Sequence, residues 1–96
     1  MLIRGWRAAP HLVWTCYDDS DDWVVFDPRC GDVHLLSAAA RVLWDLIDRS
    51  PSLSTSQLVA ALADRLDRAA DEELATVTCE TLDFMDRAGL VTPELQ

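Results

Sequence analysis

The spacing of apolar residues changes once along this chain, between Leu36 and Ser37, and this change constrains the fold most. Before it, the runs LVWTCY (12–17), WVVFD (23–27) and DVHLL (32–36) are rich in β-branched and aromatic residues, as strands are. After it, apolar residues recur about every 3.6 positions, which is typical of helices with one buried face. This order predicts an α+β architecture in which a small sheet precedes the helices.

Polar turns separate the three expected strands. The acidic run DDSDD, from Asp18 to Asp22, has repelling charges and no apolar residue, which favours an exposed hairpin loop. In PRCGD, Pro28 removes a backbone donor and Gly31 can take the positive φ of a tight turn. Because such short links favour hairpins, we expect a three-stranded antiparallel meander with its third strand, 32–36, at an edge.

The helical part divides into three helices with recognisable ends. Ser37 is a good N-cap for the first helix, and Ser54 with Gln57 forms a capping-box pattern at the start of the second. Gly89 stands where a C-terminal glycine belongs after the third helix. Trp44 falls on the margin of the first apolar stripe and is expected to be partly buried. The three helices resemble the trihelical unit of winged-helix proteins.

Length and charge limit the class of protein. The 96 residues, half of them apolar, predict one packed domain, 1–96, with strands over about 12–36 and helices over about 37–89. The net charge is −9 and lysine is absent, which opposes binding to nucleic acid or to an anionic membrane. Neither a membrane-spanning run nor a secretory signal is indicated, so a cytoplasmic location is expected.

Residues suited to chemistry are few. The three cysteines are far apart, and the chain has no CxxC pair and no glycine-rich nucleotide-binding motif. The acidic loop lacks the spacing, the central Gly and the terminal Glu of an EF-hand. His34 and Asp32 share a strand face and could in principle form an acid–base pair, but local spacing places no nucleophile beside them. We therefore expect no catalytic residue, no metal site and no cofactor.

The expected edge strand, 32–36, is the feature that can carry a function. Its unpaired N–H and C=O groups could accept another extended chain as an added strand. Alternatively, the segment GLVTPEL (89–95) or a second copy of the protein could cover this edge. The residues alone leave both interpretations open.

The stretch VVFDPRCGDVHLLSAAARVLWDLI (24–47) resembles the core signature of the PqqD-like family, which includes recognition elements for ribosomally made, post-translationally modified peptides. The matching features are Gly31, Leu35-Leu36, Ala38 to Ala40, Val42-Leu43 with Leu46, Leu58 with Leu62, and Gly89-Leu90-Val91. The form GDVHLLS, with Trp6 and Trp14 upstream, is most similar to a subgroup associated with HPr kinase-related proteins. Ala38 departs from the family pattern, where many members have proline, but Ser37 can still cap the helix.

This resemblance implies a peptide chaperone without enzymatic activity. Members of the family hold the leader segment of a precursor peptide as a strand beside the third strand, in a groove toward the third helix, and present it to a modifying enzyme. On this sequence, the implied peptide-binding residues are Asp32, Val33, His34, Leu35 and Leu36 on the strand, and Val77, Thr81, Leu82 and Met85 on the helix.

The implied partners are a leader peptide and a modifying enzyme, which the subgroup resemblance would make HPr kinase-related. No nucleic acid or membrane partner is implied. Two other functions stay open: a winged-helix DNA-binding regulator and a structural adaptor subunit that binds no leader. The charge argues against the regulator. The sequence names neither the precursor peptide nor the product, and it does not decide between a monomer and a homodimer.

Overall fold

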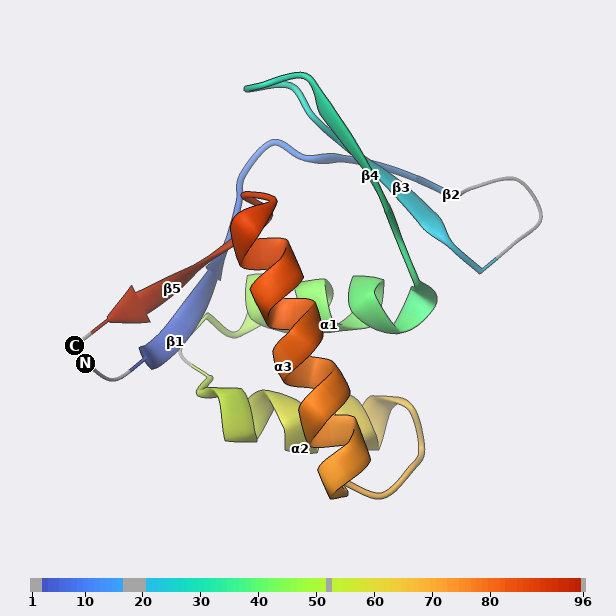
Figure 1. Ribbon diagram of the computed structural model, residues 1–96, viewed down its shortest axis with the longest axis vertical. Helices are drawn as coiled ribbons and strands as arrows, with labels where there is room; N and C mark the ends of the chain where they lie inside the picture. The colour runs from blue at the N-terminus through green and yellow to red at the C-terminus, as the bar shows by residue number, and fades with distance from the viewer. Residues whose placement is uncertain (1–2, 17–20, 52, 96) are drawn as a thin grey trace.

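The computed structural model describes residues 3–16, 21–51 and 53–95 and has two sheets and three helices within them (Figure 1). The elements in chain order are β1 (Ile3–Ala8), β2 (Val13–Cys16), β3 (Trp23–Asp27), β4 (Asp32–Leu36), α1 (Ala38–Arg49), α2 (Thr55–Arg65), α3 (Glu72–Arg87) and β5 (Val91–Leu95). The predicted α+β class, with a meander followed by three helices, is confirmed. Residues 17–20, which include most of the expected acidic loop, lie outside the described residues.

The meander β2–β3–β4 is antiparallel, and its two faces differ in burial. Trp14, Val25 and His34 are aligned across the three strands, on the face that packs on the helices. The next row, one residue along each strand, places Val13 beside Phe26 and Val33 on the exposed face. The period of two in the sequence therefore corresponds to one covered and one open face.

Aromatic rings fix the meander against α1. The rings of Trp14 and Trp44 lie 5.1 Å apart between their centroids. The guanidinium of Arg41 lies 4.2 Å from the centroid of the Trp14 ring, within cation–π range, and Arg41 also forms an ion pair with Asp45. Trp44 is 7% exposed, so the expectation of partial burial was wrong. Its indole N–H, which donates to the Leu90 carbonyl at 3.0 Å, finds a partner inside the core.

The helix starts follow the predicted caps. The Ser37 hydroxyl accepts a hydrogen bond from the Ala40 N–H at 3.2 Å, and Ser54 and Gln57 form both hydrogen bonds of a capping box. Asp71 caps α3. The core between the helices contains Leu43, Ile47, Leu58, Leu62, Leu74, Leu82, Met85 and Leu90.

Two strands at the chain ends were not predicted. β1 and β5 pair antiparallel, from Ile3 opposite Leu95 to Ala8 opposite Val91. Gly5 and Pro93 are unfavourable residues in strands, so neither segment has a strong strand pattern by itself. Trp6 anchors the pair to the helices, because its indole N–H donates to the Thr55 hydroxyl at 3.2 Å.

None of the helices in the described parts of the chain is long and apolar enough to cross a membrane.

Candidate functional site: the open edge of β4

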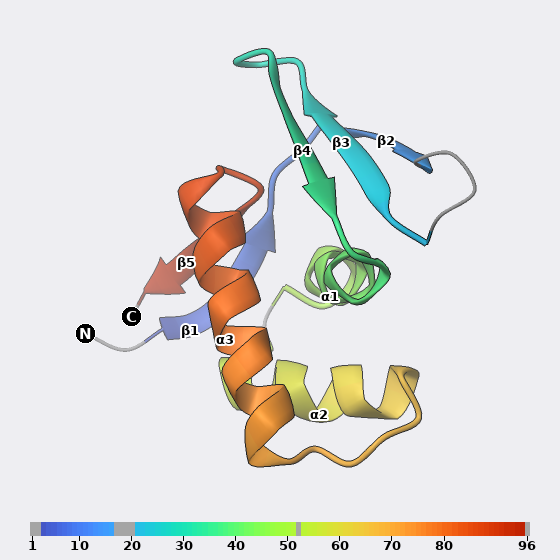
Figure 2. The same cartoon turned by 45° about the vertical axis from the view of Figure 1, so that its right-hand side comes forward.

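β4 is the last strand of its sheet. It pairs with β3 on one side, and no described strand pairs with its other side. The C-terminal segment, which could have covered this edge, pairs with β1 instead through β5. In Figure 2, β4 is the strand of the meander that lies nearest to α3. The expected edge position of this strand is confirmed, and its open side is directed toward α3.

The turn before β4 determines which of its backbone groups face outward. Paired residues in an antiparallel ladder alternate between hydrogen-bonded and non-hydrogen-bonded pairs. If Asp27 and Asp32 formed a non-hydrogen-bonded pair, the Gly31 N–H would donate to the Pro28 carbonyl. It donates instead to the Asp27 carbonyl, at 2.8 Å, so Asp27 and Asp32 form a hydrogen-bonded pair. Asp32 therefore directs its backbone groups toward β3, and by alternation Val33 directs its own away from β3.

The same alternation applies further along the strand. His34 is opposite Val25 and has the same orientation as Asp32, so its backbone groups are used within the sheet. Leu35 has the orientation of Val33. The free N–H and C=O groups of Val33 and Leu35 thus lie along the open edge.

A cavity of about 260 Å³ lies between the end of β4 and α3. Its lining residues are Leu35, Leu36, Ser37, Ala40, Glu80, Thr81 and Phe84. Phe84 is 43% exposed, and its ring meets the His34 ring edge to face at 6.0 Å between centroids. The His34 Nε2 atom is buried and has no hydrogen-bond partner in the described part of the chain. We call the space between β4 and this face of α3 the β4–α3 groove.

A second, smaller cavity of about 50 Å³ continues from the foot of the groove into the space between α1 and α3. It shares Ser37, Ala40 and Thr81 with the larger cavity. Its remaining lining residues are Ala39, Leu43, Leu62, Leu74, Val77 and Thr78.

The residues expected on the helix wall fall into two groups. Val77, which is 49% exposed, and the half-buried Thr81 both lie at the cavities described above. Leu82 and Met85 are 2% and 0% exposed, so the structure corrects their assignment and places them in the core. The apolar residues of α3 contribute both to the core and to the groove. Helical periodicity alone does not indicate which of them belongs to which.

Phe84 and Thr78 were missed by the sequence reasoning. Phe84 is one of several apolar residues of α3, and its exposure and its contact with His34 place it at the groove. A polar residue within an apolar stripe was the one available signal for Thr78. Asp32 and His34 form no hydrogen bond with each other within residues 3–16, 21–51 and 53–95, so the structure gives no support to an acid–base pair.

The side chain of Arg29 links the turn before β4 to Gly89, just after the end of α3. The Arg29 side chain donates two hydrogen bonds to the Asp27 carboxylate and a third to the Gly89 carbonyl. Hydrogen bonds from the Arg29 side chain favour the ionised form and lower the pKa of Asp27 to about 2. The hairpin and α3, the two sides of the groove, are thereby joined at one end.

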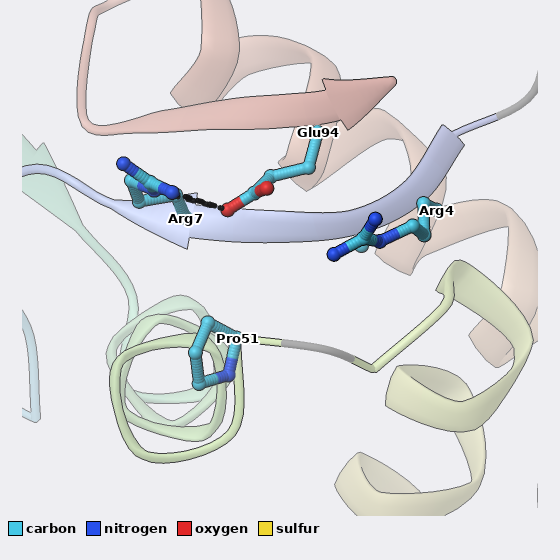
Figure 3. Close-up of a pocket in the computed structure, with 5 residues that line it drawn as sticks. Arg4, Arg7, Pro51 and Glu94 are labelled. Carbon is cyan, nitrogen blue, oxygen red and sulfur yellow. Dashed lines mark hydrogen bonds and ion pairs between the residues drawn. The ribbon is translucent and has the colours of Figure 1, made fainter. Parts of the chain in front are cut away.

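Another cavity, of about 190 Å³, lies beside β1 and is lined by Arg4, Gly5, Arg7, Pro51 and Glu94 (Figure 3). Arg7 and Glu94 form an ion pair there, at 2.9 Å between Nη2 and Oε1. This cavity shares no lining residue with the β4–α3 groove. Among the described residues, no cluster of three or more His, Cys, Asp or Glu could hold a metal ion.

Comparison with known proteins gives two matches of different kinds. Residues 22–91 match the family model described as coenzyme PQQ synthesis protein D, PqqD. A solved structure titled "TbiB1 in Complex with the TbiA(beta) Leader Peptide" superposes with a TM-score of 0.68 over 94% of this chain and 99% of that chain. The two chains are 14% identical, so this likeness shows a shared fold. A comparison with curated proteins finds no match.

Proposed function

The chain belongs to the PqqD family, and we propose that it binds the leader segment of a ribosomally made precursor peptide as an added strand on β4. In this proposal the protein has no catalytic role. It holds the leader in the β4–α3 groove and presents the rest of the precursor to a modifying enzyme.

The observation that carries this proposal is the open edge of β4 beside α3. Val33 and Leu35 each offer one N–H and one C=O to an incoming strand, and such backbone bonds supply affinity without requiring a particular leader sequence. An edge of this kind promotes aggregation unless it is covered or used. A bound peptide would cover it.

Selectivity would come from the side of the groove formed by α3. Phe84, Val77 and Leu35 expose apolar surface there, while Glu80 is the charged residue at the larger cavity. Side chains of an added strand alternate between its two faces, so every second leader residue would point toward this apolar wall. The leader we expect therefore has apolar residues at alternate positions.

The solved structure with the same fold is a complex of TbiB1 with a leader peptide, and this supports the same class of ligand for this chain. The resemblance to the HPr kinase-related subgroup further suggests a modifying enzyme of that kind. Whether the protein acts as a monomer or a homodimer depends on whether β4 pairs with a peptide or with a second copy.

The test is a binding titration with the leader of a precursor peptide encoded beside the gene. We expect a dissociation constant of about 0.1–10 μM, equivalent to about 7–10 kcal/mol. A scrambled peptide of the same composition serves as the control. Equal affinity for the leader and the scrambled peptide would contradict leader recognition. The role in presentation is tested separately, by comparing conversion of the precursor by the enzyme with and without this protein.

A further inference from the structure

Thr78 contributes an unusual group to the small cavity at the foot of the β4–α3 groove. Its side chain is 1% exposed, and its hydroxyl oxygen has no hydrogen-bond partner in the described residues. Buried polar groups are nearly always hydrogen-bonded, and an unsatisfied one costs free energy. Thr81, one turn further along α3, shows the usual solution, because its hydroxyl donates to the Val77 carbonyl at 2.8 Å.

Apart from Thr78, and from Ser37 and Thr81 where it adjoins the larger cavity, the small cavity is lined by apolar residues, and it has room for part of a side chain. Leu43, Leu62 and Leu74 form its deeper walls, and Ala39 and Ala40 present only methyl groups. Its volume of about 50 Å³ exceeds the ~15 Å³ that one water molecule needs. A purely apolar side chain in this space would leave the Thr78 hydroxyl without a partner, whereas an apolar stem that ends in a polar group would also satisfy it.

The charges around the site restrict that end group. Among the described residues, none that lines the small cavity is charged, so an ion entering it would lose its hydration without a counter-charge. Glu80 at the adjoining cavity and the net charge of −9 oppose an acidic side chain in particular. The end group that fits the cavity is therefore neutral and can donate a hydrogen bond to the Thr78 hydroxyl or accept one from it.

We propose that this cavity is an anchor site for one residue of the bound peptide, and that Thr78 selects there a side chain with an aliphatic stem and a neutral hydrogen-bonding group, such as threonine or glutamine. This inference rests on the proposed peptide-binding function. It adds a sequence preference that strand addition alone does not provide, because backbone pairing accepts many sequences.

The free protein provides the first half of the test. Thr78→Val keeps the shape of the side chain and removes the unsatisfied hydroxyl. We expect its melting temperature to rise by about 4 °C or more, the shift typical of a modest stabilisation in a domain of this length. Thr76→Val, the same substitution at an exposed position of α3, is the matched control and should change the melting temperature less. A lower melting temperature for Thr78→Val would overturn the proposal, since it would mean that a protein group or a water molecule in the cavity already satisfies the hydroxyl in the free protein.

The second half uses a phage-displayed library of random linear peptides, selected on the full-length wild-type protein. Selected peptides should share a threonine or glutamine at one position. Thr78→Val should weaken binding of these peptides about tenfold, equivalent to about 1.4 kcal/mol, and should not weaken binding of analogues with valine at that position. Thr78→Ser should retain most of the affinity, and Thr76→Val should leave it unchanged.

The peptide selection can fail in two ways, and each one contradicts a different part of the proposal. Peptides that bind across β4 without a shared anchor residue, or with affinity unchanged by Thr78→Val, would overturn the anchor site and leave strand addition intact. Recovery of no binding peptide at all would overturn the anchor site together with the proposed function.

Discussion

Arg29 donates two side-chain hydrogen bonds to the Asp27 carboxylate, from Nε to Oδ1 at 2.9 Å and from Nη2 to Oδ2 at 2.8 Å. Its Nη2 also donates to the Gly89 carbonyl oxygen, at 3.1 Å. The Asp27 side chain is buried, whereas that of Arg29 is about half exposed. The contact joins the β3–β4 turn to the end of α3. It thus links the strand and the helix that together form the groove.

This contact predicts a loss of stability in acid. The pKa of Asp27 lies at about 2 in the folded protein against an ordinary value of 3.8. Between these values the unfolded chain binds the proton more readily, so the contribution is complete above about pH 4 and is lost as the pH falls toward 2. Asp27→Asn should flatten the dependence of melting temperature on pH in this window. Asp64→Asn, at an exposed position of α2, is the control; the same flattening in both variants would contradict the assignment to Asp27.

Proline at Val33 or at Leu35 should abolish peptide binding. Each residue directs its N–H away from β3, so proline there removes a donor for the added strand without removing one from the sheet. Val33→Ala and Leu35→Ala keep the N–H and should still bind; Val33→Ala should bind with affinity near that of the wild type, and Leu35→Ala more weakly because Leu35 lines the groove. Circular dichroism would confirm that the variants are folded. Full binding by both folded proline variants would exclude strand addition at this edge.

Two substitutions on α3 should separate the groove from the core. Phe84→Ala removes a partly exposed ring at the groove and should weaken peptide binding with little change in the free energy of unfolding. Leu82→Ala removes a fully buried side chain and should cost about 2–5 kcal/mol of stability. Denaturant unfolding and a binding titration on both variants check this. A large loss of stability in Phe84→Ala would assign that ring to the core.

His34→Ala should change peptide affinity only slightly, because the residue contributes its backbone to the sheet and its ring mainly to the contact with Phe84. A binding titration of the leader with wild-type protein and the variant checks the affinity. Leader-dependent conversion of the precursor by the modifying enzyme, compared at saturating concentrations, checks for a catalytic role. Complete loss of conversion by a variant that still binds the leader would favour a catalytic role for His34.

The elements that were predicted correctly carry local signals. Ser54 and Gln57 mark a helix start within four residues, and Gly31 marks a turn whose short length dictates a hairpin. The pairing of β1 with β5 has no such local signal, because it joins residues near opposite ends of the chain. The ion pair of Arg7 with Glu94 joins the same two strands. Strand formation there depends on the tertiary fold, which outweighs the local effect of Pro93.

The groove was only partly predictable for a related reason. The edge position of β4 follows from the order of short links, and its backbone needs no particular side chain to pair. Which residues of α3 face β4 depends on how α3 packs on α1 and α2. Leu82 and Phe84 are both apolar and differ only in the neighbours that they meet, and this difference decides which one can touch a peptide.

Amide hydrogen exchange of the full-length protein, resolved by residue and measured with and without saturating leader peptide, tests strand addition on β4 most directly. We predict that the Val33 and Leu35 amides exchange rapidly in the free protein and at least about tenfold more slowly in the complex, as newly paired N–H groups do. The amides of His34 and Leu36, already paired with β3, should change less. Binding of the leader with unchanged exchange at both Val33 and Leu35 would contradict the account.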